Sequence, residues 1–437
     1  MIKKLSILTV AIIIAISVNA QAWQQVGTSI SVSNASNEKL PQLFADGNGD
    51  MYMAYINDGN GVAVTKLNDA GDEWEQVGSS QYISSDLYVT NLIITGSTDE
   101  LFVSYTTETG AKVFKFEGTS WTQVGDTFIE VTNGSLEITF DGQTLAVLYN
   151  DQGAGDLRVE KWNSNNSTWE QYLTVIENGI FMNTRYFYKD SDYYYVIYGK
   201  DNNIIVKSDE TGAWTTNATY AGYENFKFQN RTNRPNIAIL NSSNIEIYEA
   251  DDDVCEQIGN TFDMGGQSDY IFGINQSGGS DRIIIYRIGN YLYAKNNTNP
   301  DNDWETLGAS PFITEYSLPA DVKYSNSAIP YFVYFNLSDN PNYLIEVMKY
   351  DISTEIDELS KNNILTYPNP TNGIINFEFA DNKIHQITIS EITGKTIIEK
   401  VNIQQNEMID LSNFESGIYI IKIQTDKEIF TTKIVKE

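Results

Sequence analysis

The sequence predicts an all-β protein: a seven-bladed β-propeller closed by its N-terminal strand, followed by a small β domain. Three observations predict this fold. A short phrase that starts with Trp and ends in Gly recurs along the chain, a series of tyrosines recurs half a unit out of step with it, and both series stop before Lys361. A period of roughly 40 to 50 residues indicates repeated supersecondary units that bury their faces against each other.

The Trp phrase is clear in five copies and degraded in two. The clear copies are Trp23–Gly27, Trp74–Gly78, Trp121–Gly125, Cys255–Gly259 and Trp304–Gly308, and the degraded ones start at Trp169 and Trp214. The Trp recurs at the same position of each unit, as packing between neighbouring sheets requires, so we predict that these rings lie in the core. Cys255 takes a Trp position, which predicts a packed small hydrophobe in place of a reactive thiol.

Three strand-like runs lie between consecutive phrases. In the second unit they are Asp86–Thr95, Glu100–Thr106 and Lys112–Phe116, and Trp121 opens the fourth. Gly and polar residues separate the runs, as turns between strands require. Each unit is therefore predicted to form the four-stranded sheet of one blade.

The second strand of most units ends in tyrosine before a polar turn. The series is Tyr55, Tyr105, Tyr149, Tyr198, Tyr286 and Tyr334, with Leu240 in the fifth unit. The phrase at Trp23 has no strands before it, whereas the last unit, Leu318–Ile352, has no phrase of its own. We therefore predict that the N-terminal strand completes the last blade and hides its edge.

The first twenty residues read as a signal peptide. Lys3 and Lys4 precede the apolar run Leu5–Val18, which is too short to span a membrane, and Val18-Asn19-Ala20 offers a cleavage site. The chain has one cysteine, so it forms no internal disulfide. We expect a signal peptide at 1–20, a propeller at 21–357 and a C-terminal domain at 358–437, with export across the periplasm.

The C-terminal residues carry a second pattern. It consists of Tyr367-Pro368-Asn369-Pro370 with Gly373, then Gly417, Tyr419 and Lys422 in one strand, and finally Lys433, Val435 and Lys436. In residue type, order and final position this pattern resembles the type A C-terminal sorting domain of type IX secretion. The residues alone indicate only a small β domain with alternating apolar strands.

The resemblance implies an immunoglobulin-like β-sandwich that directs the protein to the type IX secretion machinery. It also implies removal of the domain on export, with release of the protein or attachment to the cell surface. We therefore expect a secreted or cell-surface protein.

The chain is strongly acidic, with a formal net charge of −30. From Lys361 onward there are eight lysines against ten Asp and Glu, so almost all of the net negative charge lies in the predicted propeller. Binding to nucleic acid or an anionic membrane requires clustered Lys and Arg. The sequence therefore predicts neither kind of partner.

Catalytic motifs are scarce. The single histidine, His385, lies in the C-terminal domain, which excludes His-based triads and metal sites from the propeller. The hairpin Asp69–Trp74 matches part of the Asp-box, a motif of sialidases, but such boxes only make turns. The Arg234-Pro235 pair does not have the Arg-Ile-Pro form found in sialidases. The sequence favours a binding module over an enzyme. A carboxylate-dependent glycan-degrading enzyme, either a glycosidase or a lyase, stays the alternative, and a purely adhesive role is a third possibility.

No cofactor or metal is expected. The run Asp46–Asp50 has alternating oxygen ligands like the start of a calcium loop, but Met51 stands where glycine belongs, so a polar hairpin is favoured. Asp251–Asp253 is likewise predicted to be a solvated turn.

Polar loops after the tyrosines supply the candidate ligand contacts. Asn, Asp and nearby rings suit sugar hydroxyls, although any turn contains such residues. The candidates are Asn57, Asp58, Asn150, Asp151, Lys200, Asp201, Asn336 and Asp339. The sequence therefore predicts a secreted or cell-surface propeller that binds a glycan or protein ligand.

Overall fold

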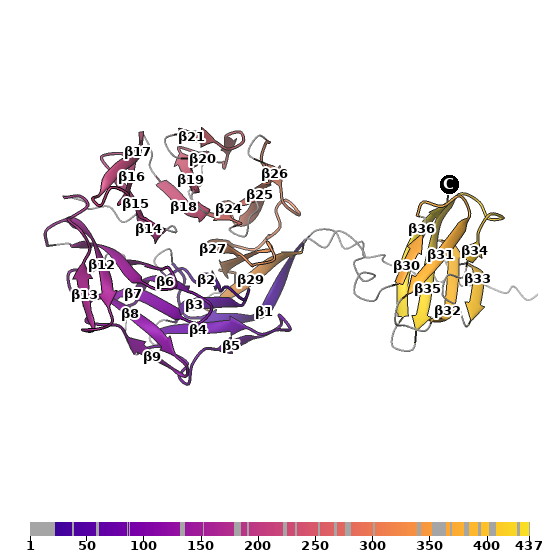
Figure 1. Ribbon diagram of the computed structural model, residues 1–437, viewed down its shortest axis with the longest axis horizontal. Helices are drawn as coiled ribbons and strands as arrows, with labels where there is room; N and C mark the ends of the chain where they lie inside the picture. The colour runs from indigo at the N-terminus through magenta and orange to yellow at the C-terminus, as the bar shows by residue number, and fades with distance from the viewer. Residues whose placement is uncertain are drawn as a thin grey trace, which may run out of the picture. The chain divides into compact units, whose positions relative to one another are not determined.

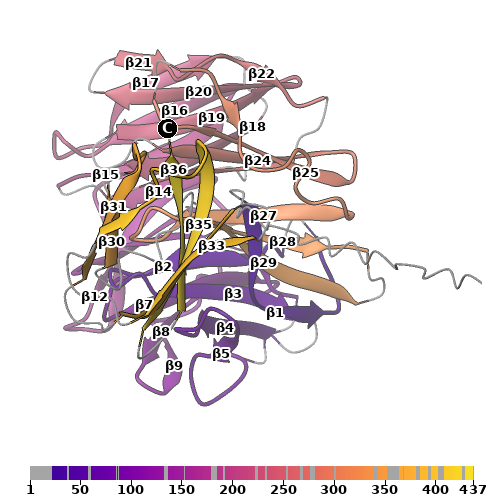
Figure 2. The same ribbon diagram turned by 90° about the vertical axis from the view of Figure 1, so that its right-hand side faces the viewer.

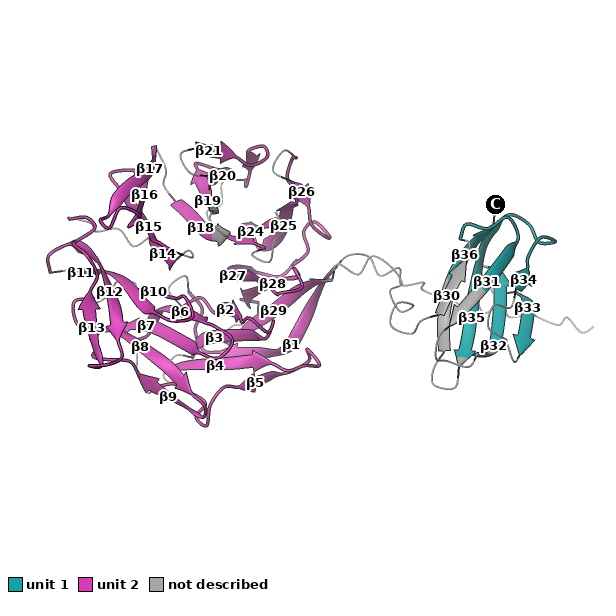
Figure 3. Cartoon of the chain, viewed as in Figure 1, with its two compact units in different colours: residues 1–21, 352–437 teal, residues 22–351 magenta. Residues whose placement is uncertain are grey.

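A computed structural model describes residues 22–436 with gaps at 37–38, 58–60, 85, 87, 132–135, 152, 179–184, 190–191, 222–224, 232–233, 252–253, 266–268, 276–280, 300–301, 339–341, 352–363, 368, 380–383, 392–394, 402–407 and 426–428. The chain divides into two compact units (Figure 3), one formed by Ala22–Asp351 and the other containing Ile352–Glu437. The described residues contain only strands, bridges and turns, and they form no helix that is long and apolar enough to cross a membrane.

The described strands of the first unit form seven antiparallel sheets, and in six of them the strands follow chain order. The first three sheets are β2 (Gln42–Ala45), β3 (Met51–Asn57), β4 (Gly61–Leu67) and β5 (Trp74–Gln76); β6 (Thr90–Gly96), β7 (Leu101–Thr107), β8 (Gly110–Glu117) and β9 (Ser120–Gln123); and β10 (Leu136–Phe140), β11 (Leu145–Asp151), β12 (Asp156–Asn163) and β13 (Thr168–Gln171).

The next three sheets are β14 (Arg185–Lys189), β15 (Tyr194–Lys200), β16 (Asn203–Ser208) and β17 (Thr215–Ala221); β18 (Asn225–Arg231), β19 (Arg234–Asn241), β20 (Asn244–Asp251) and β21 (Val254–Gln257), with β22 (Phe262–Asp263) also paired to β20; and β23 (Tyr270–Ile274), β24 (Arg282–Ile288), β25 (Tyr291–Asn297) and β26 (Glu305–Thr306).

The seventh sheet joins the two ends of the unit. Its strands β27 (Ser317–Tyr324), β28 (Pro330–Asn336) and β29 (Tyr343–Asp351) are followed at the outer edge by β1 (Ala22–Val32). β1 runs antiparallel to β29, with Trp23 opposite Tyr350 and Val32 opposite Tyr343. The N-terminal strand therefore occupies the place that a fourth strand occupies in the other sheets.

The sheets surround a centre toward which their first strands face. Figure 1 shows β2, β6, β14, β18 and β27 nearest this centre and β5, β9, β13, β17 and β21 at the outside, and Figure 2 shows the same sheets from the side. β2 contacts both β6 and β27, and Tyr188 of β14 stacks on Phe228 of β18 at 4.8 Å. Sheets arranged in this way form a β-propeller.

The core lies between neighbouring sheets. Leu43 and Met53 of the first sheet share one buried cluster with Val333 and Val347 of the seventh. Equivalent clusters join the other neighbours; the one between the third and fourth sheets contains Leu148. Because apolar side chains from two sheets fill each gap, each sheet depends on both of its neighbours.

The outer strands are joined by the Trp phrase. The indole nitrogen of Trp121 donates to the carbonyl oxygen of Val77 at 3.1 Å, and that of Trp304 donates to Ile258 at 3.2 Å. A Cβ atom on Gly308, where φ is +79°, would lie 3.3 Å from the ring of Trp23. In these copies the next Trp thus packs on the space that the glycine leaves open, and the indoles of Trp121 and Trp304 also donate to the residue before that glycine.

The degraded copy at Trp169 departs from this arrangement at its glycine position. Leu173 stands in the glycine position of the phrase at Trp169 and still has a left-handed backbone, with φ at +57°. Trp214 packs edge-on against Tyr172 with ring centroids 6.4 Å apart. The backbone turn is therefore kept where the glycine is lost. The side chain of Cys255 and the run Asp252–Asp253 lie outside the described residues.

The second-strand tyrosines are all buried. Four of their hydroxyls donate to carboxylates, Tyr105 to Asp86 at 2.7 Å, Tyr149 to Glu160 at 2.7 Å, Tyr198 to Glu177 at 2.9 Å and Tyr334 to Glu346 at 2.6 Å. A buried phenol requires a hydrogen-bond partner, which these carboxylates provide. The tyrosines thus act as packed rings with a polar anchor.

The C-terminal unit has two sheets around one core. The strands are β30 (Ile364–Tyr367), β31 (Ile374–Phe379) and β34 (Met408–Asp410) in one sheet, and β33 (Thr396–Val401), β32 (Ile384–Glu391), β35 (Gly417–Thr425) and β36 (Ile429–Lys436) in the other. Ile375 and Ile409 of the first sheet pack with Ile421 and Ile434 of the second. The unit is therefore a two-layer β domain. The side chain of His385 lies outside the described residues.

The residues of the C-terminal sequence pattern meet in this unit. The side-chain amide of Asn369 donates to the carbonyl of Lys433 at 3.0 Å, and its oxygen accepts from the backbone of Val435 at 2.9 Å. Gly373 has φ at +137°, and a Cβ there would lie 3.0 Å from the Cα of Ser412. The start and the end of the pattern are thus hydrogen-bonded to each other. Pro368 lies outside the described residues.

Candidate functional site

The first strands enclose a central cavity of about 730 Å³. Residues from β2, β6, β10, β14, β18, β23 and β27 line it, one strand from each sheet. Its volume lies in the range of small-molecule sites. All seven sheets therefore present residues to one common space.

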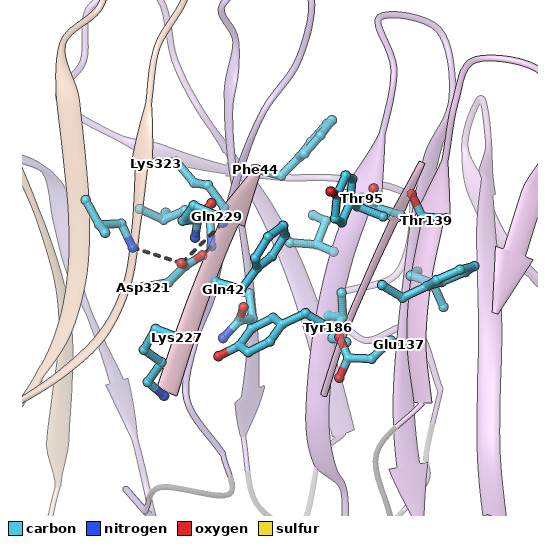
Figure 4. A pocket seen from close by; sticks show the side chains of 18 of the residues that line it. Gln42, Phe44, Thr95, Glu137, Thr139, Tyr186, Lys227, Gln229, Asp321 and Lys323 are labelled. Atoms are coloured by element: carbon cyan, nitrogen blue, oxygen red, sulfur yellow. Dashed lines mark hydrogen bonds and ion pairs between the residues drawn. The ribbon is translucent and has the colours of Figure 1, made fainter. Parts of the chain in front are cut away.

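Polar side chains interrupt the apolar lining. Figure 4 shows Glu137, Tyr186 and Lys227 toward one end of the cavity and Thr95, Thr139 and Gln229 toward the other. Glu137 and Tyr186 are each the second residue of their strand, and Lys227 is the third residue of β18. Strand residues alternate between the two faces of a strand, so a register set by the buried neighbours directs these side chains inward.

Glu137 is a carboxyl group in a desolvated position. Burial raises its pKa to about 7, although the nearby guanidinium of Arg185 acts in the opposite direction. Burial also lowers the pKa of Arg185, to about 10, while Glu137 partly offsets that effect. Because β10 and β14 are neighbouring inner strands, the two opposite charges belong to one electrostatic group.

Tyr186 and Lys227 extend this group onto the next sheet. The hydroxyl of Tyr186 donates to the carbonyl oxygen of Phe226 at 3.3 Å, one residue before Lys227. Burial raises the pKa of the Tyr186 phenol and lowers that of the Lys227 ammonium. The cavity therefore holds a carboxyl, a guanidinium, a phenol and an ammonium, all with perturbed proton affinity.

Asp321 has a structural task in the same cavity. Its carboxylate accepts hydrogen bonds from the backbone of Leu43 at 2.9 Å and of Val322 at 2.8 Å, and Lys323 lies 3.4 Å away. Leu43 belongs to β2 and Asp321 to β27, so the carboxylate bonds the first sheet to the seventh. A backbone N–H on an inner edge strand has no sheet partner on that side, and Asp321 supplies one.

The loop residues predicted as ligand contacts lie in four different sheets. Asn57 ends β3 and donates to the hydroxyl of Tyr82 at 3.2 Å, whereas Lys200 ends β15 and forms an ion pair with Glu177 at 2.7 Å. The ion pair and hydrogen bonds hold the pKa of Glu177 at about 2, with the bond from Lys200 the largest cause. Asp201 is an exposed turn residue with φ at +49°.

The other loop candidates are also engaged within the fold. Asp151 accepts from the backbone of Gly153 at 3.0 Å and lies 3.4 Å from Arg158, and Asn150 precedes it on β11. The amide of Asn336 lies 3.3 Å from the carboxylate of Glu346. Asp58 and Asp339 lie outside the described residues. The described candidates are not brought together into one site, and ligand binding by them stays a prediction.

The run Asp46–Asp50 forms the turn between β2 and β3. The carboxylate of Asp46 accepts from the backbone of Asn48 at 2.8 Å and of Asp50 at 2.9 Å, and Asp50 pairs with Lys66 at 2.6 Å. Across the described ranges, no three Cys, His, Asp or Glu side chains gather as metal ligands would.

The sequence did not predict the cavity residues, because the ligand contacts it suggested all lie in the loops after the second strands. A signal was nevertheless present. The first strands are apolar runs, and Glu137, Lys227 and Asp321 are charged residues within such runs. Polar residues in a predicted core strand mark a cavity more specifically than Asn or Asp in a turn.

The sorting-domain resemblance is confirmed by a comparison with protein families. Residues 365–437 match the family described as the secretion system C-terminal sorting domain. The match implies that the protein is exported, that it is secreted or on the cell surface, and that its tail meets the secretion machinery. A comparison with curated proteins finds no match.

Several solved structures are similar to the chain at low identity. An oligogalacturonate lyase from Vibrio parahaemolyticus is 11% identical over 77% of this chain and 100% of its own, with a TM-score of 0.49. The Aleuria aurantia lectin, a six-bladed β-propeller that recognises fucose, is 12% identical over 74% and 95%, with a TM-score of 0.43. AofleA from Arthrobotrys oligospora is 11% identical over 66% and 90%, with a TM-score of 0.45. At such similarity none of them bears on what this chain binds.

Proposed function

We propose that the protein is an exported, closed seven-bladed β-propeller that binds an extracellular ligand in its central cavity. Closure is supported by the pairing of β1 with β29 and by the hydrogen bond from Leu43 to Asp321. Secretion follows removal of residues 1–20 and passage through the periplasm, and the domain at 358–437, an immunoglobulin-like sandwich, serves the outer-membrane step.

One observation carries the binding role. The outer parts of the sheets repeat, whereas the cavity is lined by different polar residues from one strand to the next. Packing alone rewards uniform apolar side chains, and buried polar groups cost free energy unless they find partners. An unlike set of polar side chains around a cavity of about 730 Å³ is therefore what a specific ligand site requires.

A cavity-filling variant tests this role. The chain from Gln21 to Glu437 is screened on a glycan array and against soluble sugars, and captured ligands are then offered to Thr139→Tyr and to Thr122→Tyr. Thr139 lines the cavity, whereas Thr122 is exposed on the outer strand β9. We expect Thr139→Tyr to abolish capture and Thr122→Tyr to retain it. Equal capture by both variants would place the ligand outside the cavity.

A glycan-degrading enzyme is the second candidate, and Glu137 is the observation that favours it. A carboxyl with a pKa of about 7 is suited to give and take protons near neutral pH. If the site turns glycans over, Glu137→Gln retains binding and loses released sugar. Binding without any released sugar in the parent chain rejects this candidate.

A further inference from the structure

The cavity differs in charge from the rest of the chain, and this difference bears on the ligand of the proposed binding site, on which the following inference rests. The chain as a whole has a net charge of −30. Four of the charged residues that line the cavity are cations and two are carboxylates: Arg185, Lys189, Lys227 and Lys323 against Glu137 and Asp321. The cavity is thus a local site of positive charge in an acidic protein.

Three of the cations have acidic partners. Lys323 lies 3.4 Å from Asp321, and Lys189 forms an ion pair with Asp141 at 2.6 Å. Arg185 and Glu137 interact electrostatically. These pairs neutralise most of the positive charge within the cavity.

Lys227 is the cation that remains. Among the described residues its ammonium has no ion pair and no hydrogen bond; the ring of Tyr270 lies 6.0 Å away. Asp321 and Asp269 act on it at longer range, Asp321 more strongly. Asp321 already accepts from Leu43 and Val322 and lies beside Lys323, and Asp269 is paired with Arg287. A half-buried ammonium without an ion pair has lost part of its hydration, so an anion bound beside it would be stabilised.

The neighbouring side chains indicate what the anion belongs to. Gln42 and Gln229 line the cavity with side-chain amides that make no hydrogen bond within the described part of the chain. Amides donate and accept at once, which suits hydroxyl groups, and the ring of Phe44 offers an apolar surface in the same cavity. Volume, amides and ring together fit a small hydroxylated ring better than a peptide segment.

We propose that the central cavity binds a carboxylated sugar, with its carboxylate at the Lys227 ammonium and its hydroxyls at the amides of Gln42 and Gln229. The sugar is either free or the terminal unit of a glycan, since both present the same chemistry.

Matched sugars test the carboxylate directly. Calorimetry on the chain from Gln21 to Glu437 compares glucuronic acid with glucose and galacturonic acid with galactose, each free and at the end of a short oligosaccharide. We expect at least one acid to bind roughly tenfold or more tightly than its neutral twin, as a charge-assisted hydrogen bond provides. The free and terminal arms show which source the site accepts.

Variants assign the preference to one residue. Lys227→Met is expected to remove the preference for the acid and to leave binding of the neutral twin unchanged, whereas Lys227→Arg retains most of it. Lys112→Met is the control, because Lys112 pairs with Asp86 at 2.7 Å outside the cavity lining. It should bind as the parent does.

Two results overturn the inference: an acid that binds no better than its neutral twin, and a Lys227→Met variant that weakens both twins equally. Failure of every acidic sugar to bind also overturns it. The proposed function fails separately, when Thr139→Tyr leaves ligand capture unchanged.

Discussion

The outer and inner strands of the propeller follow opposite rules. At the outside the same contact recurs: a Trp ring rests on the glycine of the preceding phrase, as Trp169 does on Gly125 and Trp304 on Gly259. At the inside the first strands present different residues, such as Glu137 on β10 and Lys227 on β18. Because the outer contacts hold neighbouring sheets together, the inner strands are free to differ. The repeated packing contacts and the unlike polar side chains are therefore located on different strands of the same sheets.

The largest effect is expected from removing the N-terminal strand. A chain that starts at Ser33 lacks the strand that pairs with β29 and loses Val26 and Val32 from the core shared by the first and seventh sheets. The free energy lost through the open sheet edge and the unfilled gap should exceed the whole stability of the domain, which is typically about 5–15 kcal/mol. Circular dichroism and gel filtration should show an unfolded or aggregated chain. A cooperative transition at the parent's midpoint would disprove closure by β1; a chain that starts at Gln21 is the control.

Removal of one Trp side chain from the outer strands should lower the stability by a smaller but still large amount. Trp304 is 7% exposed and packs on Gly259, so Trp304→Ala should lower the free energy of unfolding by about 3–5 kcal/mol. Tyr291 in the same sheet is 44% exposed, and Tyr291→Ala should change it by no more than about 0.5 kcal/mol. Urea titration followed by fluorescence measures both. An equal loss of stability in the two variants would show that the contact between Trp304 and Gly259 does not stabilise the propeller more than an exposed ring does.

A substitution on an inner strand, Glu137→Gln, should stabilise the protein, whereas the two preceding changes destabilise it. Burial raises the pKa of Glu137 from 4.5 to about 7. A raised carboxyl pKa means that the folded state holds the proton more tightly, so stability is full below the unfolded pKa and is lost as pH rises through about 7. Glu137→Gln keeps a neutral side chain at all pH values. We expect it to stabilise the protein by on the order of 2 kcal/mol at about pH 8 and to make little difference at about pH 4.

Thermal and urea unfolding at the two pH values measure this effect. A stabilising change that also reduces ligand binding would establish that the cavity sacrifices stability for function. A variant that is destabilised by the same amount at both pH values would contradict the assignment of the titration to Glu137.

The smallest expected difference, between two glycine variants, isolates the close approach of a ring to a glycine. Gly125 and Gly118 both have positive φ, +67° and +71°, so alanine strains the backbone at either position. A Cβ at Gly125 would lie 2.7 Å from Trp162 and Trp169, whereas Gly118 has nothing within 4 Å. Gly118→Ala should cost about 1 kcal/mol and Gly125→Ala about 1–2 kcal/mol more. Equal midpoints in urea would show that the ring moves aside without cost.

Much of the fold was predictable because it repeats. The predicted runs of the second unit correspond to β6, β7 and β8, with Trp121 in β9 as expected. A pattern that recurs in several units averages out local ambiguity, and alternating apolar residues specify the register of a strand. The small β domain predicted at the C-terminus is likewise found, as the two sheets formed by β30 to β36. The precise boundary between the two domains stays a prediction.

The candidate site was less predictable for a physical reason. The turn residues that suggested ligand contacts, such as Asp151 and Asn336, accept hydrogen bonds from backbone N–H groups of their own loops. Their chemistry is the same whether a turn or a ligand receives the bond. Glu137 and Lys227 are 90 residues apart in the sequence. They line one cavity only because their strands, from different sheets, face the same centre.

The sequence by itself determined the strand pattern, the spacing of the Trp and Tyr series and the sorting tail, because each depends on periodicity or on a local motif. Only the tertiary structure decided which side chains share the central cavity and which carboxylates are already engaged. That assignment depends on distances between strands remote in the chain, and the free energy of a charged group is set by the neighbours that folding brings to it.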